Sequence, residues 1–178
     1  LDSYVNGKPW FKSGEAQIVE AFSDPNQWLR HELWVETDFD SDADGKLDRM
    51  HVAVCRPGQT EDGNLKLPVI YNSSPYFSGV ASDEEGVFWE VNHELGEIGP
   101  ERNHPQVVAK NNRPVISNGH VGSWLPRGYI VVHSSSPGTG LSEGAPTVGG
   151  ENESLAPQAV IEWLTGKRKG YTSPASDT

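Results

Sequence analysis

The chain of 178 residues has few cysteines, few basic residues and no long apolar segment. Its single cysteine, Cys55, cannot form a disulfide within the chain and lies in an apolar run, where cysteine is usually a small buried side chain. No apolar stretch is long enough to span a bilayer. Acidic residues outnumber basic ones by 25 to 14, and the net charge of −11 would repel a polyanion such as DNA. These shortages argue against a disulfide scaffold, a membrane-spanning protein and a nucleic-acid-binding protein.

Glycine and proline, by contrast, are abundant, at 19 and 13 residues, and the chain has six tryptophans. Hydrophobic residues make up 35% and charged residues 22%, which is the composition of a folded protein. The length suffices for one domain with a sizeable core, and the glycine and proline content favours a loop-rich α/β or β architecture. The chain begins at Leu1 without an initiator methionine or an apolar signal core. We therefore expect a processed or truncated product, and a secreted or periplasmic location is favoured over a cytoplasmic one.

Residues 1–30 mix charges, aromatics and turn formers, and apart from a helical candidate at 15–22 they show no clear period. We expect them to form an N-terminal arm that lies on a domain formed by residues 31–178. This domain opens with a β-hairpin, because residues 33–37 and 50–55 both show a period of two. The polar segment between the two strands, which is rich in aspartate, forms the turn.

Two short apolar runs, at residues 67–72 and 129–133, are rich in β-branched and aromatic side chains and predict strands buried on both faces. The stretch between them, from 73 to about 126, is predicted to be irregular, and loops of this length tend to carry function. One apolar stripe at helical spacing predicts a helix over 154–165, which ends before Gly166. The order hairpin, strand, long loop, strand and helix is typical of the opening of an α/β domain with a parallel pair of strands.

Residues 140–144 match G-x-S-x-G, the pattern of a nucleophile elbow, with Ser142 at its centre. In such an elbow the serine lies on a turn that leads directly from a strand into a helix. Ser142 lies several residues beyond the predicted strand, and the segment that follows, rich in glycine and proline, cannot begin a helix. We therefore interpret this segment as a structural glycine-rich loop.

Asp40, Asp42 and Asp44, followed by Gly45 and, further on, by Asp48, match the first half of an EF-hand loop, in which carboxylate oxygens converge on Ca²⁺. The twelfth position of that loop would be His51 instead of the bidentate glutamate, and a strand follows instead of a helix. The motif has two interpretations, a bound cation or a solvated acidic hairpin turn, and the sequence favours the turn.

The histidines do not form the pattern of a metal site, because no two of them have the four-residue spacing of a helical zinc site. We therefore expect no zinc site, and the residues assigned to the site include no metal ligand and no cofactor-binding residue. The histidine at the end of the second predicted buried strand has the least ordinary position. The six are His31, His51, His93, His104, His120 and His133.

Residues 72–76, with the sequence Asn-Ser-Ser-Pro-Tyr, come directly after the first predicted buried strand. In open α/β sheets, ligands bind at the carboxyl ends of the strands. The hydroxyl of Tyr76 could donate a hydrogen bond there to an oxyanion that develops during a reaction. On spacing alone, an ordinary packed tyrosine of a turn remains the favoured interpretation.

Taken in order, several segments resemble the Xaa-Pro dipeptidyl-peptidases, a branch of the serine peptidases that also includes cocaine-esterase-like and α-amino-acid ester hydrolases. The resemblance covers the chain from about residue 31 to its end. The family commonly has an acidic residue in the turn after the second buried strand, where this chain has Ser134-Ser135-Ser136-Pro137. The segments that carry the resemblance are 36–49, 67–70 with 74–76, 126–129, 138–144, 159–166 and 171–173.

The resemblance implies an α/β-hydrolase catalytic domain with a Ser-Asp-His triad, of which residues 31–178 form the N-terminal portion. It also implies that Tyr76 is the tyrosine whose hydroxyl helps to form the oxyanion hole. The nucleophile strand would follow shortly after Thr178, and the aspartate and histidine much later. We therefore expect this chain alone to be inactive, since removal of triad residues lowers the rate by orders of magnitude.

The function that the resemblance implies is the release of N-terminal Xaa-Pro dipeptides through an acyl-enzyme. The partners would be a proline-containing peptide and the remainder of the same enzyme, and the sequence is compatible with a homo-oligomer. Two alternatives stay open: an esterase or acylase of the same fold, and a non-catalytic Ca²⁺-binding module built on the acidic turn.

Overall fold

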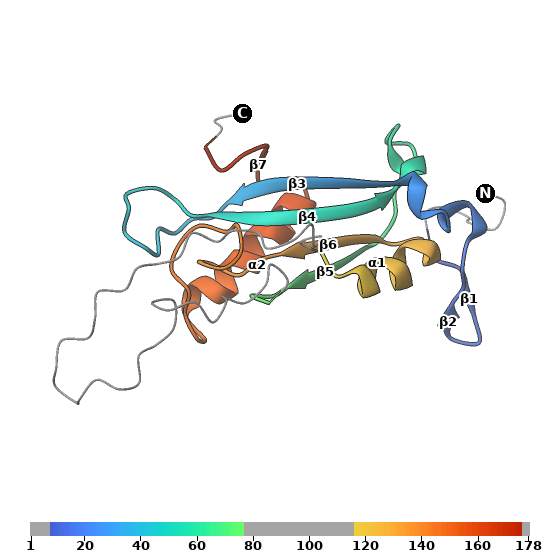
Figure 1. Ribbon diagram of the computed structural model, residues 1–178, viewed down its shortest axis with the longest axis horizontal. Coiled ribbons are helices and arrows are strands. Elements are labelled where there is room, and N and C mark those ends of the chain that lie inside the picture. The colour runs from blue at the N-terminus through green and yellow to red at the C-terminus, as the bar shows by residue number, and fades with distance from the viewer. Residues whose placement is uncertain (1–7, 77–115, 176–178) are drawn as a thin grey trace, which may run out of the picture.

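The computed structural model describes residues 8–76 and 116–175, and within them it shows a mixed sheet with helices on both faces (Figure 1). The sheet has the order β5-β6-β4-β3-β7. Its neighbours are antiparallel except for the parallel pair β5 and β6. The strands are β3 (Trp28–Glu36), β4 (Arg49–Pro57), β5 (Val69–Ser73), β6 (Ile130–Ser134) and β7 (Gly170–Tyr171). This is the mixed α/β architecture that the sequence predicts.

The predicted hairpin is confirmed as β3 and β4, which pair without interruption from Trp28 opposite Pro57 to Glu36 opposite Arg49. The sheet thus begins at Trp28, just before the boundary at residue 31 that separates the expected arm from the expected domain. β4 lies at the centre of the sheet, between β3 and β6, and six consecutive residues from Met50 to Cys55 are buried.

The two predicted apolar strands are confirmed as β5 and β6, and they run parallel with Asn72 opposite His133. β6 is buried over Val131–Ser134, as expected. The prediction of burial on both faces is wrong for β5, because Val69 is exposed and the rest of the strand is only half-buried. The reason is its place in the sheet: among the described strands, β5 is the outermost on its side.

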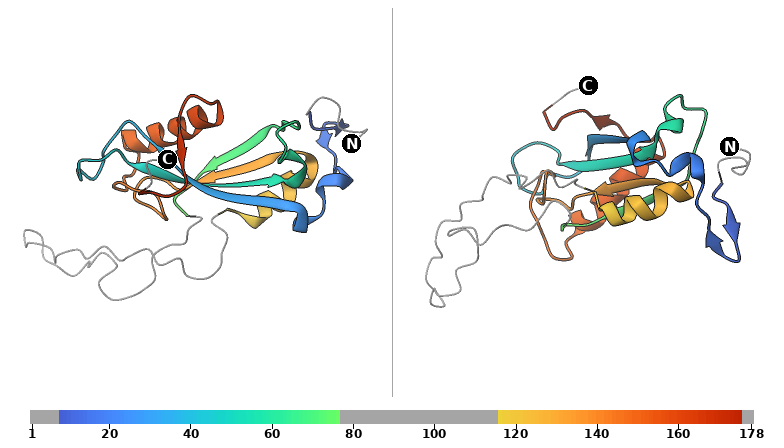
Figure 2. Two further views of the ribbon diagram at one scale, coloured as in Figure 1. Left: turned by 90° about the horizontal axis from the view of Figure 1, so that it is seen from above. Right: turned by 45° about the vertical axis from the view of Figure 1, so that its right-hand side comes forward.

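The sheet separates two apolar clusters, because successive strand residues point to opposite faces. Helix α2 (Glu151–Leu164) covers one face, where its Ala156 and Val160 pack on Met50, Val52 and Val132. Helix α1 (Asn118–Trp124) covers the other. There Val121 and Leu125 pack with Ala53, Cys55, Ile116 and Val131. Helices α1 and α2 lie on opposite faces of the sheet (Figure 2).

The helix predicted at 154–165 is confirmed, although it begins earlier, at Glu151. Glu151 and Glu153 lie in its first turn, where negative charge is favourable. Its end is the expected one: Gly166 adopts a φ of +77° and its N–H bonds to the carbonyl of Trp163 at 2.9 Å. Pro157 lies inside this helix, and because proline has no N–H the helix lacks one backbone hydrogen bond there.

The N-terminal arm differs from the expectation, because the helical candidate at 15–22 is wrong. Its first residues form β2 (Glu15–Ala16), which pairs with β1 (Phe11–Lys12), and only Glu20–Phe22 form a 3₁₀ turn, η2. The arm packs on the domain through Val19, Phe22 and Leu67. The remaining 3₁₀ turns are η3 (Pro25–Gln27), η4 (Gly58–Thr60) and η5 (Leu125–Arg127).

The long stretch predicted to be irregular contains helix α1, whose N-terminus is capped by the Ser117 hydroxyl, so the prediction is wrong there. The expectation for residues 77–115 lies outside the described residues. No helix in the described part of the chain has the length and apolar character that crossing a membrane requires.

Candidate functional site

The carboxyl ends of β5 and β6 lie side by side, because the two strands are parallel and in register (Figure 1). The residues that follow each strand therefore meet at one edge of the sheet, which is where α/β proteins bind ligands. Tyr76 comes from the turn after β5, and Ser135 and Ser136 follow β6. This edge is the candidate site.

His133 joins the two strand ends by a side-chain hydrogen bond. It is only 2% exposed, and its Nδ1 lies 2.9 Å from the carbonyl oxygen of Asn72. A carbonyl oxygen only accepts, so Nδ1 carries the proton. Burial lowers the pKa of His133 to about 4, outweighing the opposite effect of this hydrogen bond, and the neighbouring His51 and His120 lower it further. The ring is therefore a neutral donor near pH 7.

A second set of contacts fixes the same two strand ends through Ser134. The hydroxyls of Tyr71 and Ser134 lie 2.7 Å apart, and the N–H of Ser74 donates to the carbonyl of Ser134 at 3.0 Å. Burial raises the pKa of Tyr71, so its hydroxyl stays protonated. Together with the bond from His133, these contacts hold the beginning of the turn after β5 against the end of β6.

Tyr76 lies at this edge, and its side chain is 74% exposed. Its backbone N–H donates to the hydroxyl of Ser74 at 3.2 Å, so the backbone of the turn is held while the phenol projects toward solvent. A phenol in this position can donate to a ligand that binds at the strand ends.

Ser142 has a structural role in this geometry. Its Oγ donates to the carbonyl of Ser135 and accepts the N–H of His51, both at 2.9 Å. The next helix, α2, begins only at Glu151, so the strand–turn–helix context of a nucleophile elbow is missing. The G-x-S-x-G match belongs to a loop that fastens the end of β6 to β4.

The rest of this loop lies against the beginning of β4. Glu143 forms two hydrogen bonds to the backbone of Arg49. Its Oε2 accepts the N–H of Arg49, and its own N–H donates to the carbonyl of Arg49, both at 3.0 Å. The indole N–H of Trp34 donates to the carbonyl of Leu141 at 3.1 Å. Partial burial raises the pKa of Glu143. At Gly144 a side chain would overlap the carboxylate of Asp48, which explains the glycine.

The acidic turn gathers a different set of carboxylates from the one that the sequence suggests. Asp40, Asp42 and Asp48 present oxygens within 4.8 Å of one another, whereas the carboxylate of Asp44 accepts the N–H of Lys46 at 2.8 Å. Asp48 is buried and accepts the N–H of Ser41 at 3.0 Å. Bonds of this kind to nearby N–H groups are typical of an aspartate-rich turn.

Sequence reasoning missed the burial of His51, which is fully buried in β4 against the ring of Trp34, with ring centroids 5.1 Å apart. Within the described residues neither of its ring nitrogens has a hydrogen-bond partner; the nearest carboxylate oxygen, on Glu32, is 3.7 Å from Nε2. Burial lowers the pKa of His51. The period of two in the hairpin was the signal that could have placed this side chain on the face of Ala53 and Cys55.

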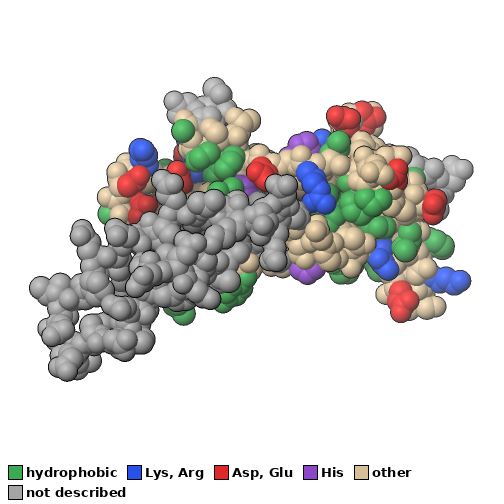
Figure 3. All heavy atoms as spheres, in the orientation of Figure 1, with side chains coloured by type: hydrophobic (Ala, Val, Ile, Leu, Met, Phe, Trp, Pro, Cys, Tyr) green, Lys and Arg blue, Asp and Glu red, His purple; other side chains and the backbone are tan. Residues whose placement is uncertain are grey.

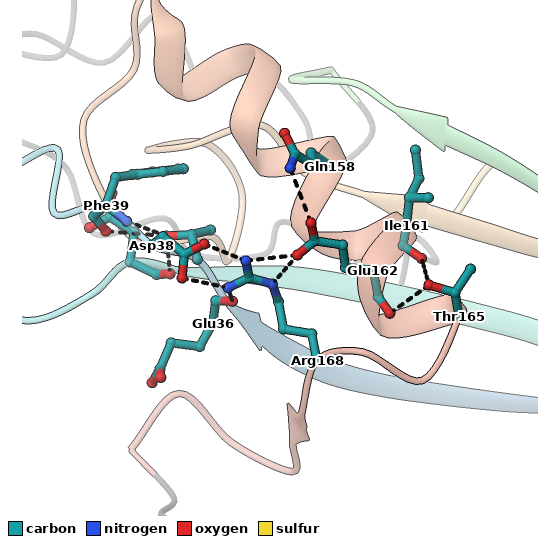
Figure 4. Close-up of polar contacts among 10 residues, drawn as sticks. Glu36, Asp38, Phe39, Gln158, Ile161, Glu162, Thr165 and Arg168 are labelled. Carbon is teal, nitrogen blue, oxygen red and sulfur yellow. Dashed lines mark hydrogen bonds and ion pairs between the residues drawn. The ribbon is translucent and has the colours of Figure 1, made fainter.

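Arg168 connects the end of α2 to the hairpin (Figure 4). Its guanidinium donates to the carboxylates of Asp38 and Glu162 and to the carbonyl of Glu36, at distances of 2.9, 2.9 and 3.1 Å. Arg49 connects the hairpin to β7: it pairs with Glu36 at 2.9 Å, and its guanidinium carbon lies 3.8 Å from the centre of the Tyr171 ring. These contacts position the segment that leads out of α2.

A cavity lies at the opposite end of the molecule. Hydrophobic side chains are exposed there, at the end that carries β1 and β2 (Figure 3). A cavity of about 520 Å³ lies between this hairpin and η5, at the amino end of β6, and Phe11, Glu15, Trp124, Arg127 and Tyr129 line it. It lies away from Tyr76 and the carboxyl ends of the parallel strands.

The sequence is similar to a known family and to several curated proteins. The model of the X-Pro dipeptidyl-peptidase (S15) family matches residues 44–176. A putative Xaa-Pro dipeptidyl-peptidase of Rhodopirellula baltica is 58% identical over 93% of this chain and 27% of its own length. A putative Xaa-Pro dipeptidyl-peptidase of Bacillus cereus is 38% identical over 90% of this chain and 24% of its own length. The Xaa-Pro dipeptidyl-peptidase of Lacticaseibacillus rhamnosus is 33% identical over 97% of this chain and 25% of its own length.

The chain thus spans about a quarter of the length of these curated relatives. The family match covers the acidic turn from Asp44, β4, the strand ends with Tyr76, and the helix α2. The resemblance suggested by the ordered segments is confirmed: the chain belongs to the X-Pro dipeptidyl-peptidase family S15.

Proposed function

We propose that this chain supplies one side of the active site of a serine exopeptidase that releases N-terminal Xaa-Pro dipeptides. The observation that carries the proposal is the position of Tyr76. In a chain of this family, its exposed phenol follows β5 at the edge where two parallel strands end side by side. This is the edge at which α/β enzymes assemble their catalytic groups.

The fold proposed for the complete protein is an α/β-hydrolase, with residues 31–178 as the N-terminal portion of its catalytic domain and residues 1–30 as an arm. The parallel pair β5 and β6 and the helices on both faces of the sheet support this proposal. β5 is outermost among the described strands on its side, so a further parallel strand can be added there. That strand would carry the nucleophile, and the aspartate and histidine would come later in the chain.

In the proposed reaction, the serine oxygen attacks the carbonyl carbon of the proline residue, and its proton passes to the histidine of the triad. The C–N bond then breaks, the histidine protonates the leaving amine, and the acyl-enzyme is hydrolysed by water. Tyr76 donates its hydroxyl hydrogen bond to the oxyanion of each tetrahedral intermediate. The net charge of −11 favours the approach of a substrate with a cationic amino terminus.

The test uses the complete gene product and a chromogenic Gly-Pro-anilide. We expect Tyr76→Phe to lower kcat by about 10²- to 10³-fold, the range for the loss of one oxyanion donor. Tyr129→Phe is the matched control, because Tyr129 packs on Trp124 at the amino end of β6 and should keep full activity. Activity of Tyr76→Phe equal to that of the wild type would contradict the role of Tyr76.

The same assay distinguishes the alternatives of the same fold. Hydrolysis of simple esters without cleavage of Gly-Pro-anilide would favour the esterase or acylase and would contradict the peptidase. If the complete gene product turns over neither substrate, the enzymatic proposal fails as a whole.

A further inference from the structure

We propose that His133 is a positioning residue for this reaction: its ring N–H holds the carbonyl of Asn72 and thereby fixes the turn that presents Tyr76. The inference rests on the proposed function, because it assigns to His133 an effect that is exerted through Tyr76. His133 itself lies inside the sheet and touches no reacting atom.

The bond between His133 and Asn72 is buried. The ring is 2% exposed and the distance from Nδ1 to the carbonyl oxygen is 2.9 Å. The register of the parallel strands also places the Asn72 carbonyl in the ladder between β5 and β6, so the ring N–H is a second donor to it, and removal of the ring costs one buried hydrogen bond at this point. The ring bond therefore adds a side-chain constraint to the backbone ladder at the end of β5.

Within residues 8–76 and 116–175, Tyr76 is held through this backbone. Its side chain is 74% exposed, so packing does not fix the phenol. The turn is held at Asn72 by His133, at Ser74 by the carbonyl of Ser134, and at Tyr76 by the hydroxyl of Ser74. Of these contacts, only the first comes from a side chain of β6.

The protonation state of His133 suits a permanent donor. Burial lowers its pKa to about 4, so the ring is neutral over the working range of most enzymes, with its proton on Nδ1. A ring with so low a pKa is a weak proton acceptor, and its burial keeps it from a substrate, so His133 is poorly suited to act as a general base. This separates His133 from the triad histidine that the proposed function assigns to a later part of the chain.

The experiment compares two substitutions at position 133 in the complete gene product. His133→Leu removes the donor, and His133→Asn keeps one, because the amide nitrogen of asparagine is attached to Cγ as Nδ1 is. We expect His133→Leu to lower kcat on Gly-Pro-anilide about tenfold with little change in KM, since about one neutral hydrogen bond is lost. His133→Asn should keep kcat within about threefold of the wild type.

A double-mutant cycle with Tyr76→Phe separates positioning from a general loss of structure. If His133 acts through Tyr76, His133→Leu lowers kcat in the wild type but not in the Tyr76→Phe background. An equal reduction in both backgrounds would overturn the inference, and so would a kcat of His133→Leu equal to that of the wild type. Should Tyr76→Phe itself have no effect, the proposed function fails first, and the two failures are thus distinguishable.

Thermal unfolding shows whether each variant is folded. Should His133→Leu not yield folded protein, His133→Gln replaces it, because its amide lies one bond further from the backbone and does not coincide with Nδ1. A kcat of His133→Gln as high as that of His133→Asn would then overturn the inference.

Discussion

The two faces of the sheet bury different kinds of side chain, although the same strands build both. Against α2 the sheet buries mainly apolar side chains, with Met50, Val52 and Val132 at the centre, and the buried hydroxyl of Ser134 on this face is bonded to Tyr71. Against α1 the same strands bury Ala53 and Cys55 and, on the same face, the imidazoles of His51 and His133. Burial of a polar group opposes folding unless the group is well hydrogen-bonded, so the α1 face contributes less to the stability of the fold than the α2 face does.

This difference indicates a division of labour. The α2 face contributes apolar burial, which is the main favourable term in folding. The α1 face has less apolar burial, because His51 in β4 and His133 in β6 take up buried positions there. His133 lies next to the strand end that carries the candidate site. Departures from apolar packing in buried positions are most often found at functional sites. The change from the apolar Val132 to the polar His133 is therefore consistent with a functional site at this end of β6.

The largest effect is expected from a charge on the α2 face. Val52→Asp would bury an unpaired carboxylate in an apolar cluster and should destabilise the fold by more than about 4 kcal/mol, so that little folded protein is recovered. Val148→Asp is the matched control, because Val148 is fully exposed, and its Tm should stay close to that of the wild type. Normal folding of Val52→Asp would show that the α2 face is not the stabilising one.

The second effect is a pH dependence that comes from the α1 face. A histidine whose pKa is lower in the folded than in the unfolded state favours unfolding in acid, because the unfolded chain takes up the proton first. The contribution is fully present above the unfolded value of 6.5 and is lost as the pH falls from there toward 4. For His133 the loss is about 2 kcal/mol at pH 5.

Thermal unfolding of the complete gene product between pH 8 and pH 5 tests this expectation. His51 should add to the loss, since burial also lowers its pKa. His133→Asn removes one of the two groups and should flatten the curve. The carboxylates whose pKa is lowered, such as Asp38 and Glu162, lose their contribution only at lower pH. A wild-type Tm that does not change between pH 8 and pH 5 would contradict the buried, neutral histidines.

The smallest effect is a gain in stability. His51→Leu replaces a buried ring, whose nitrogens have no hydrogen-bond partner within the described residues, by an apolar side chain of similar size. We expect a stabilisation of about 1 kcal/mol at pH 7, seen as a higher Tm. His31→Leu on the exposed part of β3 serves as the control and should give no gain. A lower Tm for His51→Leu would mean that the α1 face depends on this imidazole.

Local patterns in the sequence predicted the central elements well. The period of two in 33–37 and 50–55 identified the β3–β4 hairpin, and the two apolar runs identified the parallel strands β5 and β6. These elements were predictable because their side-chain patterns arise within a few residues. The segment 15–22 was not, because its residues are committed to β2 and η2 by contacts with Phe11 and with the sheet.

The candidate site was predictable only in part. The sequence placed Tyr76 and His133 at strand ends, but the bond from His133 to Asn72 depends on the register between β5 and β6. Register between strands that are far apart in the chain leaves no local signal. The acidic turn shows the same limit, since the buried Asp48 takes the place that the spacing had given to Asp44.

The two arginine contacts near Glu36 span very different lengths of chain, and this has a consequence for folding. Arg49 lies 13 residues from Glu36, whereas Arg168 lies 132 residues away. Because the entropy lost on closing a loop grows with its length, the β3–β4 hairpin is expected to form early, on the chain emerging from the ribosome. β7 and the contacts of Arg168 can form only after α2 has been synthesised, so the hairpin serves as the template onto which they fold last.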